Sequence, residues 1–317
     1  MKKNALLSIV IPTYNRARFL DKCLDIQIPI ARKHGIAIYI SDNASTDDTK
    51  LVVEKRKKDY SYIEYSKNTE NVGADKNFEI ALKIPDQDYV WLMGDTYHIP
   101  EELMELVLRE LLNNEKSFDY IILNANSRVC DTPSQHYSDK NKLLRDLGWH
   151  MTCMSSLVYK KSAISNANFT RYRDTYFIQV GIIFEYIEDK MFSICWIDFP
   201  SVENITIYGL KKNSWQSITF EIWVNRWSNF VFSLPPSYKL ESKLECIRSH
   251  GIKSGLFSIK GLLLLRAAGL LDYALFKKYN NIYLFAINRN KLLIFIICST
   301  PIFILNTFRK LVKKFNR

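Results

Sequence analysis

Polar and acidic side chains directly follow short apolar runs at three places in this 317-residue chain: Thr13 to Arg16, Ser41 to Asn43, and Gly94 to His98. Asp42 and Asp95 are the acids of the second and third places. If the apolar runs are parallel strands, these groups share the carboxyl edge of one sheet, where open α/β sheets bind their ligands. Carboxylates beside polar and cationic groups at such an edge suit a polar, charged ligand.

The elements that must position these groups alternate along the first 123 residues. Apolar, β-branched runs at 7–11, 36–40, 62–65, 88–93 and 119–123 predict strands. The intervening segments 17–33, 49–58, 72–83 and 100–112 have the length and end signals of helices. Strands alternating with helices form βαβ units, so the fold class is α/β with a mostly parallel, Rossmann-like sheet flanked by helices.

Three common catalytic and phosphate-binding motifs are missing. The first predicted strand is followed by Pro12 to Arg16 without glycine, so the GxGxxG of a dinucleotide site is absent. No GxxxxGK[ST] loop and no GxSxG turn occurs either. These absences exclude the P-loop class and argue against a dinucleotide-binding unit or a serine hydrolase.

Four segments together resemble family 2 glycosyltransferases of the GT-A fold. They are the opening strand and loop at 8–16, the acidic turn at 41–49, the NxG-led segment at 71–77, and the strand at 89–95 that leads to a metal-binding DxD motif. The resemblance extends more loosely to about residue 199. It implies transfer of a sugar from a nucleotide diphosphate donor with inversion at the anomeric carbon.

The resemblance also implies which residues bind the donor nucleotide. They are Thr13, Tyr14, Asn15, Arg16, Asp42, Asn43, Gly73, Lys76, Asn77 and Asp95. Taken singly, some of these residues and their neighbours have plainer explanations. Arg16 and Lys76 can be solvated surface charges, and the acids of the 41–49 turn, above all Asp47 and Asp48, can be turn or helix-cap residues. Trp91 and Tyr89 are expected in the core.

The metal motif departs from the family pattern, because this chain has Asp95-Thr96-Tyr97 where DDD or DxD is common. Asp95, with or without His98, can still help to hold Mg²⁺ or Mn²⁺ between itself and the donor phosphates. Otherwise lysine or arginine must neutralise the leaving diphosphate. The sequence leaves the need for a divalent cation open.

The second part of the resembling region must supply the general base that takes the proton of the acceptor hydroxyl. A strand is predicted at 154–159, a helix at 176–186 and a strand at 192–197. Asp174 stands at the expected start of that helix and is the predicted base; the alternative is a helix N-cap. Glu188 and Asp189 match the family's ED dipeptide in letters, but their place beyond the helix predicts a surface pair.

The net charge of +11 lies in the last quarter of the chain. Residues 239–317 hold fifteen lysines and arginines and three acids, a net of +12, and residues 1–238 have a net of −1. The predicted domains are therefore a GT-A-like domain at 1–238 and a basic, aliphatic helical module at 239–317. Its apolar segments at 255–276 and 292–305 are broken by polar residues and followed by the basic cluster of Arg309, Lys310, Lys313, Lys314 and Arg317.

Short apolar segments among cations favour in-plane binding to an anionic membrane surface. The 14 residues of the second segment span about 21 Å as a helix, short of the ~30 Å hydrocarbon core. A soluble helical subdomain with a solvated basic face is the alternative. Nucleic acid is an unsuitable partner, because modules that follow a phosphate backbone are rarely so aliphatic. The six cysteines are scattered without zinc-site spacing, which favours the cytosol.

These features predict a bacterial peripheral-membrane enzyme at the cytoplasmic face of the inner (plasma) membrane. It would transfer sugar from a nucleotide-sugar donor to a lipid-linked or oligosaccharide acceptor in O-antigen or capsule synthesis. One alternative is a catalytically inactive relative that serves as a scaffold in a glycan-assembly complex, because the DxD motif is altered. Another is a sugar nucleotidyltransferase, but the glycine-rich loop that such an enzyme needs is missing.

Overall fold

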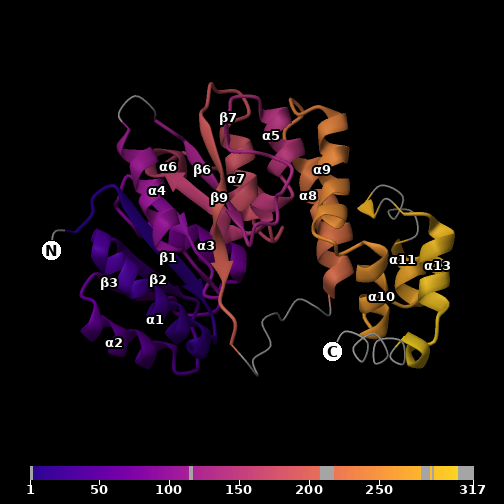
Figure 1. Cartoon of the computed structure of the whole chain (residues 1–317), viewed down its shortest axis with the longest axis horizontal. Helices are drawn as coiled ribbons and strands as arrows, with labels where there is room; N and C mark the ends of the chain where they lie inside the picture. Colours follow the sequence, from indigo (N-terminus) through magenta and orange to yellow (C-terminus); the bar gives the residue numbers. More distant parts are fainter. Residues whose placement is uncertain (1–2, 114–116, 208–217, 280–285, 288, 306–317) are drawn as a thin grey trace. The chain divides into compact units, whose positions relative to one another are not determined.

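The structure is a computed structural model that describes residues 3–113, 117–207, 218–279, 286–287 and 289–305. The chain divides into two compact units (Figure 1), which are described separately. The first comprises residues 1–210 with 234–238, and the second comprises 211–233 with 239–317. Residues 211–233 thus belong to the second unit; the domain boundary at 238 stays a prediction.

Four parallel strands form one half of the sheet of the first unit, in the order β3-β2-β1-β4. Their bounds are Leu7–Thr13 for β1, Ala37–Asp42 for β2, Ile63–Lys67 for β3 and Tyr89–Leu92 for β4. All residues of β1, β2 and β4 are buried, as expected of apolar strands covered on both faces. Thr13 pairs with Asp42, so β1 and β2 end at the same level.

The other half of the sheet is mixed. Strand β8, Leu157–Lys160, lies antiparallel between β4 and β6, Tyr120–Ala125. The long β9, Ile194–Asn204, runs parallel to β6. Two short strands, β5 at Tyr97–His98 and β7 at Gln135–Tyr137, pair antiparallel with β9. The result is a mostly parallel, mixed sheet flanked by helices, which confirms the predicted fold class.

The first unit has seven described α-helices (Figure 1). They are α1 at Ala17–His34, α2 at Thr49–Asp59, α3 at Ala74–Lys83, α4 at Glu101–Leu112, α5 at Lys140–Leu147, α6 at Lys161–Ser165 and α7 at Ile178–Tyr186. Of these, α1 to α4 and α7 correspond to helices that the sequence predicts. Helix α1 ends where expected, because Gly35 takes the left-handed conformation (φ 68°) that glycine adopts without strain. Tyr89 and Trp91 are buried in the core, as predicted.

Two predicted boundaries were wrong. The strand expected at 154–159 begins only at Leu157, because residues 154–156 form a 3₁₀ turn. In this turn Ser155 Oγ accepts a hydrogen bond from the Gly94 N–H (3.0 Å), and the Ser155 carbonyl accepts one from the Trp91 indole N–H (2.8 Å). The helix expected from Tyr176 begins at Ile178, because Tyr176 has a left-handed φ of 73°. Strands β5 and β7 and helices α5 and α6 were not predicted.

The described part of the second unit is helical. Its elements are the π-helix η5 at Glu221–Arg226, then α8 at Trp227–Ser233, α9 at Leu240–Lys253, α10 at Ile259–Ala267, α11 at Tyr273–Tyr279 and α13 at Lys291–Ser299. Aromatic stacking joins η5 to α9, with the Trp223 and His250 ring centroids 3.9 Å apart. In the described ranges no helix combines the length and apolarity needed to cross a bilayer. The basic cluster at 309–317 lies outside them.

Candidate active site

Asp95 lies just beyond β4 and joins it to the loop after β1. Arg16 Nε donates to both of its carboxylate oxygens at 2.9 Å, and Thr13 Oγ1 donates to Oδ2 at 3.1 Å. The residue is 6% exposed, and this burial raises the pKa of the Asp95 carboxyl, against the opposing effect of Arg16 and Thr13. Three of the residues that the sequence assigned to one edge are thus in direct contact.

The same loop is locked to the turn after β2. Asn15 has a left-handed φ of 51°, which asparagine tolerates better than most residues. Its backbone N–H donates to Ser45 Oγ (2.8 Å), and its side-chain oxygen accepts the Thr46 N–H (2.7 Å). The side chain of Tyr14 is 41% exposed at this edge. The backbone here is therefore fixed, and an aromatic ring is left available to a ligand.

Asp42 is fully buried at the end of β2 and shapes the following turn. Its Oδ1 accepts the Ser45 N–H (2.8 Å), and its Oδ2 accepts the Tyr65 hydroxyl (2.6 Å). Burial, followed by the hydrogen bond to Asp42, raises the pKa of the Tyr65 phenol well above its usual range. Asp42 is therefore a turn-shaping residue in this structure, and its role in binding the donor stays a prediction.

Asparagine side chains connect β2 to the NxG segment. Asn43 Nδ2 donates to Asn71 Oδ1 (2.8 Å) and to the Gly73 carbonyl (3.2 Å), and Asn43 Oδ1 accepts from Asn68 Nδ2 (3.1 Å). Gly73 has φ 83°, a conformation that favours glycine. The NxG segment thus borders the same edge as Asp42.

Asn77 binds the end of β2 from the first turns of α3. It accepts the Ser41 hydroxyl at 2.8 Å and donates to the Ser41 carbonyl at 3.1 Å. Asn77 is 3% exposed. Its role in this state is to hold α3 against β2, not to present a free amide.

Lys76 points to an acid of its own helix. Its Nζ lies 3.0 Å from Glu79, which also binds Lys83 (2.8 Å) and Arg173 (2.8 Å). Although burial acts in the opposite direction, these three cations lower the pKa of the Glu79 carboxyl to about 2. The structure therefore does not bring Lys76 to Asp95 and Arg16.

Asp47 caps helices, which agrees with its plainer interpretation as a turn or helix-cap residue. Its Oδ2 accepts the Ala17 N–H (2.9 Å) at the start of α1, and its Oδ1 accepts the Thr49 N–H (3.1 Å) at the start of α2. One carboxylate thus satisfies the unpaired donors of two helices. Asp48 directly precedes α2 but makes no side-chain cap hydrogen bond.

Asp174 is exposed in the loop before α7 and has a left-handed φ of 63°. The N-cap position of α7 is Phe177, so the N-cap alternative for Asp174 was wrong. Its assignment as the general base stays a prediction. Glu188 and Asp189 follow the end of α7, where a half-buried and an exposed residue form no enclosed site.

The residues after Asp95 pair with β9. His98 Nε2 lies 3.4 Å from Glu203, and β5 pairs Tyr97 with Asn204. Across the described residues, three metal-ligating side chains come together at His34, Glu101 and Glu105, between α1 and α4. That group contains none of the predicted donor residues, and Asp95 stays the predicted metal ligand.

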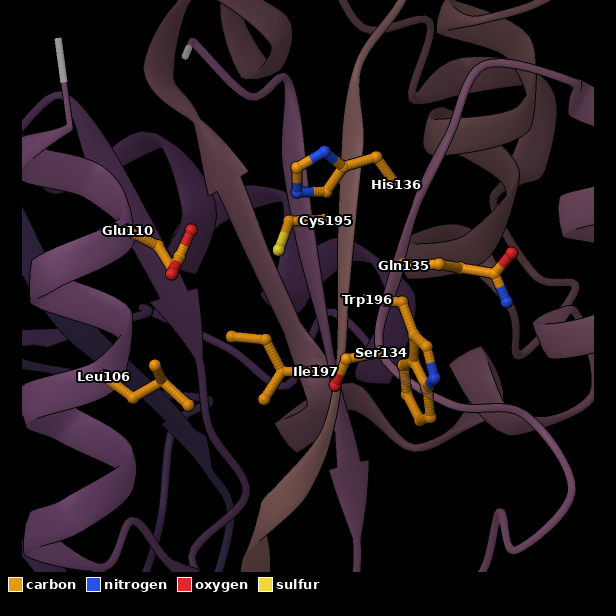
Figure 2. A pocket seen from close by; sticks show the side chains of 8 residues that line it. All are labelled: Leu106, Glu110, Ser134, Gln135, His136, Cys195, Trp196 and Ile197. Atoms are coloured by element: carbon orange, nitrogen blue, oxygen red, sulfur yellow. The ribbon is translucent and has the colours of Figure 1, made fainter. Parts of the chain in front are cut away.

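A hollow of about 320 Å³ is lined by residues of α4, β7 and β9 (Figure 2). Leu106 and Glu110 extend toward it from α4, and Cys195 to Ile197 of β9 form its floor. Ser134 to His136 complete the lining. None of the predicted donor residues lines it, so cavity size does not locate the candidate site.

Several polar residues of the site were not predicted. Ser45, Tyr65 and Asn68 complete the hydrogen bonds of Asp42 and Asn43, and Asp75 binds the loop before α7. Asn68 follows β3 immediately, so the rule that polar residues collect after strands could have found it. Tyr65 lies within β3 and gave no such signal.

Comparison with known proteins now identifies the family. The model of glycosyl transferase family 2 matches residues 8–171, slightly more than half of the chain. The chain belongs to glycosyl transferase family 2. This confirms the family that the four segments predicted. Abequosyltransferase RfbV of Salmonella typhimurium is 29% identical over 180 residues, which cover 49% of this chain and 53% of the relative. The match thus spans about half the length of that curated protein.

Solved structures extend the likeness to most of the chain. A mannosyltransferase, PcManGT from Pyrobaculum calidifontis in complex with GDP-Man and Mn²⁺, has a TM-score of 0.55 at 15% identity, over 94% of this chain and 86% of that one. TarS 1-349 of S. aureus has a TM-score of 0.54 at 13% identity, over 91% of this chain and 90% of that one. TarS 1-349 was also solved in complex with UDP-GlcNAc. That structure has a TM-score of 0.52 at 14% identity, over 82% of this chain and 75% of that one. At such identities the likeness shows the fold, and it confirms the GT-A-like architecture.

Proposed function

We propose that this chain transfers a sugar, with inversion, from a nucleotide diphosphate donor to a lipid-linked or oligosaccharide acceptor in the synthesis of a bacterial surface polysaccharide. The observation that carries the proposal is the contact of Asp95 with Arg16 and Thr13 at the carboxyl edge of a family 2 sheet. The relative RfbV, named as an abequosyltransferase, and neighbours solved with UDP-GlcNAc or GDP-Man support a sugar-nucleotide donor.

The donor nucleotide is proposed to lie over the interlocked turns of β1, β2 and α3. Exposed Tyr14 would cover it, and the buried Asp42 and Asn43 would act by fixing the turns beneath its base and ribose. Arg16 is the cation nearest the proposed diphosphate, since its guanidinium already binds Asp95. Lys76 would have to leave Glu79 to reach a phosphate.

A divalent cation fits this edge through one protein ligand. Mg²⁺ and Mn²⁺ accept one or two carboxylates with substrate phosphates as the remaining ligands, and Asp95 is the carboxylate that this chain offers. Such an ion would neutralise the charge of the leaving diphosphate. It would compete with Arg16 for Asp95, so we propose a weakly held Mg²⁺ or Mn²⁺ that binds together with the donor.

Inversion requires one general base on the acceptor side, and Asp174 is proposed for that role. Its carboxylate is exposed and therefore accessible to a hydroxyl group from solvent. A carboxylate is a suitable base for a direct displacement, in which the acceptor oxygen loses its proton as the bond to the anomeric carbon forms.

The second unit is proposed to bind the cytoplasmic face of the inner membrane. On α13, Leu292, Phe295 and Ile296 are 64%, 41% and 53% exposed, and their spacing places them on one helix face. Lys291 begins the same helix, within a segment of net charge +12. Exposed apolar side chains beside cations suit an anionic surface at which a lipid-linked acceptor would be presented.

The donor proposal is tested by a thermal-shift screen of the full chain against UDP-GlcNAc, GDP-mannose, CMP-sugars and dTDP-sugars, with and without Mn²⁺. A ligand that binds the folded state raises the melting temperature. One donor is expected to do so, and Asp95→Ala is expected to abolish the effect of Mn²⁺ on it. No shift with any donor would contradict the enzyme and favour the inactive scaffold.

The membrane proposal is tested by flotation with phosphatidylglycerol vesicles and with neutral phosphatidylcholine vesicles. We expect binding to the first only, and weaker binding of the double variant Leu292→Ser/Ile296→Ser. Leu51→Ser is the matched control, since Leu51 is 63% exposed in the first unit. Equal flotation of the double variant and wild type would contradict this face.

A further inference from the structure

Helix α3 holds the loop before α7 through two acids one helical turn apart. Asp75 Oδ2 accepts the backbone N–H of Tyr176 at 2.9 Å. Glu79 Oε2 accepts from Arg173 Nε at 3.1 Å and from Nη2 at 2.8 Å. The two acids thus bind the residues on either side of the Asp174–Thr175 pair.

The loop held in this way is locally strained. Asp174 (φ 63°) and Tyr176 (φ 73°) are both left-handed, a conformation that costs a non-glycine residue free energy unless its surroundings fix it. For a bulky aromatic residue such as Tyr176 the cost is larger than for Asp174. Because its N–H is the donor to Asp75, the hydrogen bond acts where the strain is greatest.

Asp75 itself is an unusual carboxylate. It is 7% exposed, and its Oδ1 is buried without a hydrogen-bond partner among the described residues. Burial, the largest cause, and the nearby charge of Asp174 together raise the pKa of Asp75 to about 6, against the opposing effect of the backbone N–H groups of the loop. The charged group that acts on it is Asp174 from the loop, while the Lys76 and Glu79 side chains of its own helix are paired with each other. A carboxylate kept in such a place at a cost in stability is typical of a functional site.

The N-terminal half of the same helix borders the proposed donor site. Gly73 and Asn77 are bound to Asn43 and Ser41 at the end of β2. Helix α3 therefore contacts the turns that would hold the nucleotide and the loop that carries Asp174.

We infer that Asp75 is a positioning residue: its carboxylate holds the Asp174 loop through the Tyr176 amide, so that α3 sets the place of the base relative to the donor. The inference rests on the proposed function, because it assigns Asp75 a role toward the proposed base. Glu79 supports the same loop through Arg173.

Hydrogen–deuterium exchange of the full-length protein tests the contact without requiring any substrate. In Asp75→Ala the amides of residues 174–178 should exchange at least about tenfold faster, because an amide without its acceptor opens more readily. Asp75→Asn keeps a side-chain carbonyl and should retain most of the protection. Asp86→Asn, an exposed aspartate just beyond α3, is the control. Unchanged exchange in Asp75→Ala would overturn the inference.

Steady-state transfer from the donor selected by the thermal-shift screen tests the consequence. We expect kcat to fall about 100-fold in Asp75→Ala, with the donor KM within a few fold, because a misplaced base slows chemistry more than donor binding. Asp75→Asn should recover part of this loss. Wild-type kcat in Asp75→Ala would overturn the positioning role while leaving the glycosyltransferase proposal intact. If the wild type transfers no sugar, the proposed function fails, and the exchange experiment still decides the contact.

Discussion

The donor edge and the loop before α7 are built in opposite ways. At the donor edge, every side-chain oxygen of Asp42, Asn43 and Asp95 accepts a hydrogen bond, mostly from residues of neighbouring turns. The loop before α7 leaves Asp174 exposed, and two residues have unfavourable φ angles. The difference indicates that the donor edge is preorganised by many weak bonds, and that the loop depends on a few contacts from α3. Substitutions at the donor edge should therefore affect stability and binding, and those in the loop should affect kcat.

The largest effect is expected at Asp174. Asp174→Asn removes the proposed base and should lower kcat about 10²- to 10⁴-fold, the range for loss of a general base. The melting temperature should stay close to that of wild type because the side chain is exposed. Asp189→Asn, another exposed aspartate, serves as the control in the same assay. A wild-type kcat in Asp174→Asn would remove Asp174 from the reaction.

The next effect should appear in stability at the donor edge. Arg16→Gln leaves the buried Asp95 without its charged partner and should cost about 3 kcal/mol of unfolding free energy. Because burial then raises the Asp95 pKa further, the loss should grow as pH rises through that pKa. Urea unfolding at pH 5 and pH 8 measures the loss of unfolding free energy and its increase with pH. Arg18→Gln, a neighbouring arginine on α1, controls for the loss of a cation; an equal loss in both variants would contradict the argument.

A smaller effect of opposite sign is expected at Asp75. Its folded pKa of about 6 lies above the usual 3.8, so the ionised form opposes folding, and stability falls as pH rises from about 4 through 6. Asp75→Asn should thus be more stable than wild type at pH 8, by at most about 2–3 kcal/mol for two pKa units. At pH 4 the two should be nearly equal. Lower stability of the variant at pH 8 would show that the carboxylate has partners that the structure does not indicate.

The smallest effect is expected at Tyr65. Tyr65→Phe removes one donor to the buried Asp42 and should cost about 1–2 kcal/mol, since the acceptor oxygen loses a buried hydrogen bond. The affinity for the donor should fall together with the stability, while kcat is retained. Thermal shifts with the donor measure the affinity, and steady-state kinetics measure kcat. Tyr62→Phe, on the same segment, is the comparison. A change in kcat alone would place Tyr65 on the acceptor side instead.

Much of this architecture could be predicted because short apolar runs and end signals are local. The strands up to β4, helices α1, α2 and α4, and the shared edge of Thr13, Asp42 and Asp95 follow from such signals. The start of α7 could not be predicted, because Tyr176 is left-handed through contacts with α3, a hundred residues away in sequence. The pairing of His98 with Glu203 depends on β9, and no local pattern indicates it.

The position of Tyr97 limits how this site can change through evolution. Tyr97 packs against the core and pairs with β9, and Cys23 Sγ donates to its carbonyl oxygen at 3.4 Å. A single substitution to aspartate would put a charge into this packing without its ion, and would destabilise the protein before any metal ligand was gained. A second carboxylate at position 97 would therefore require further changes in the residues packed around it.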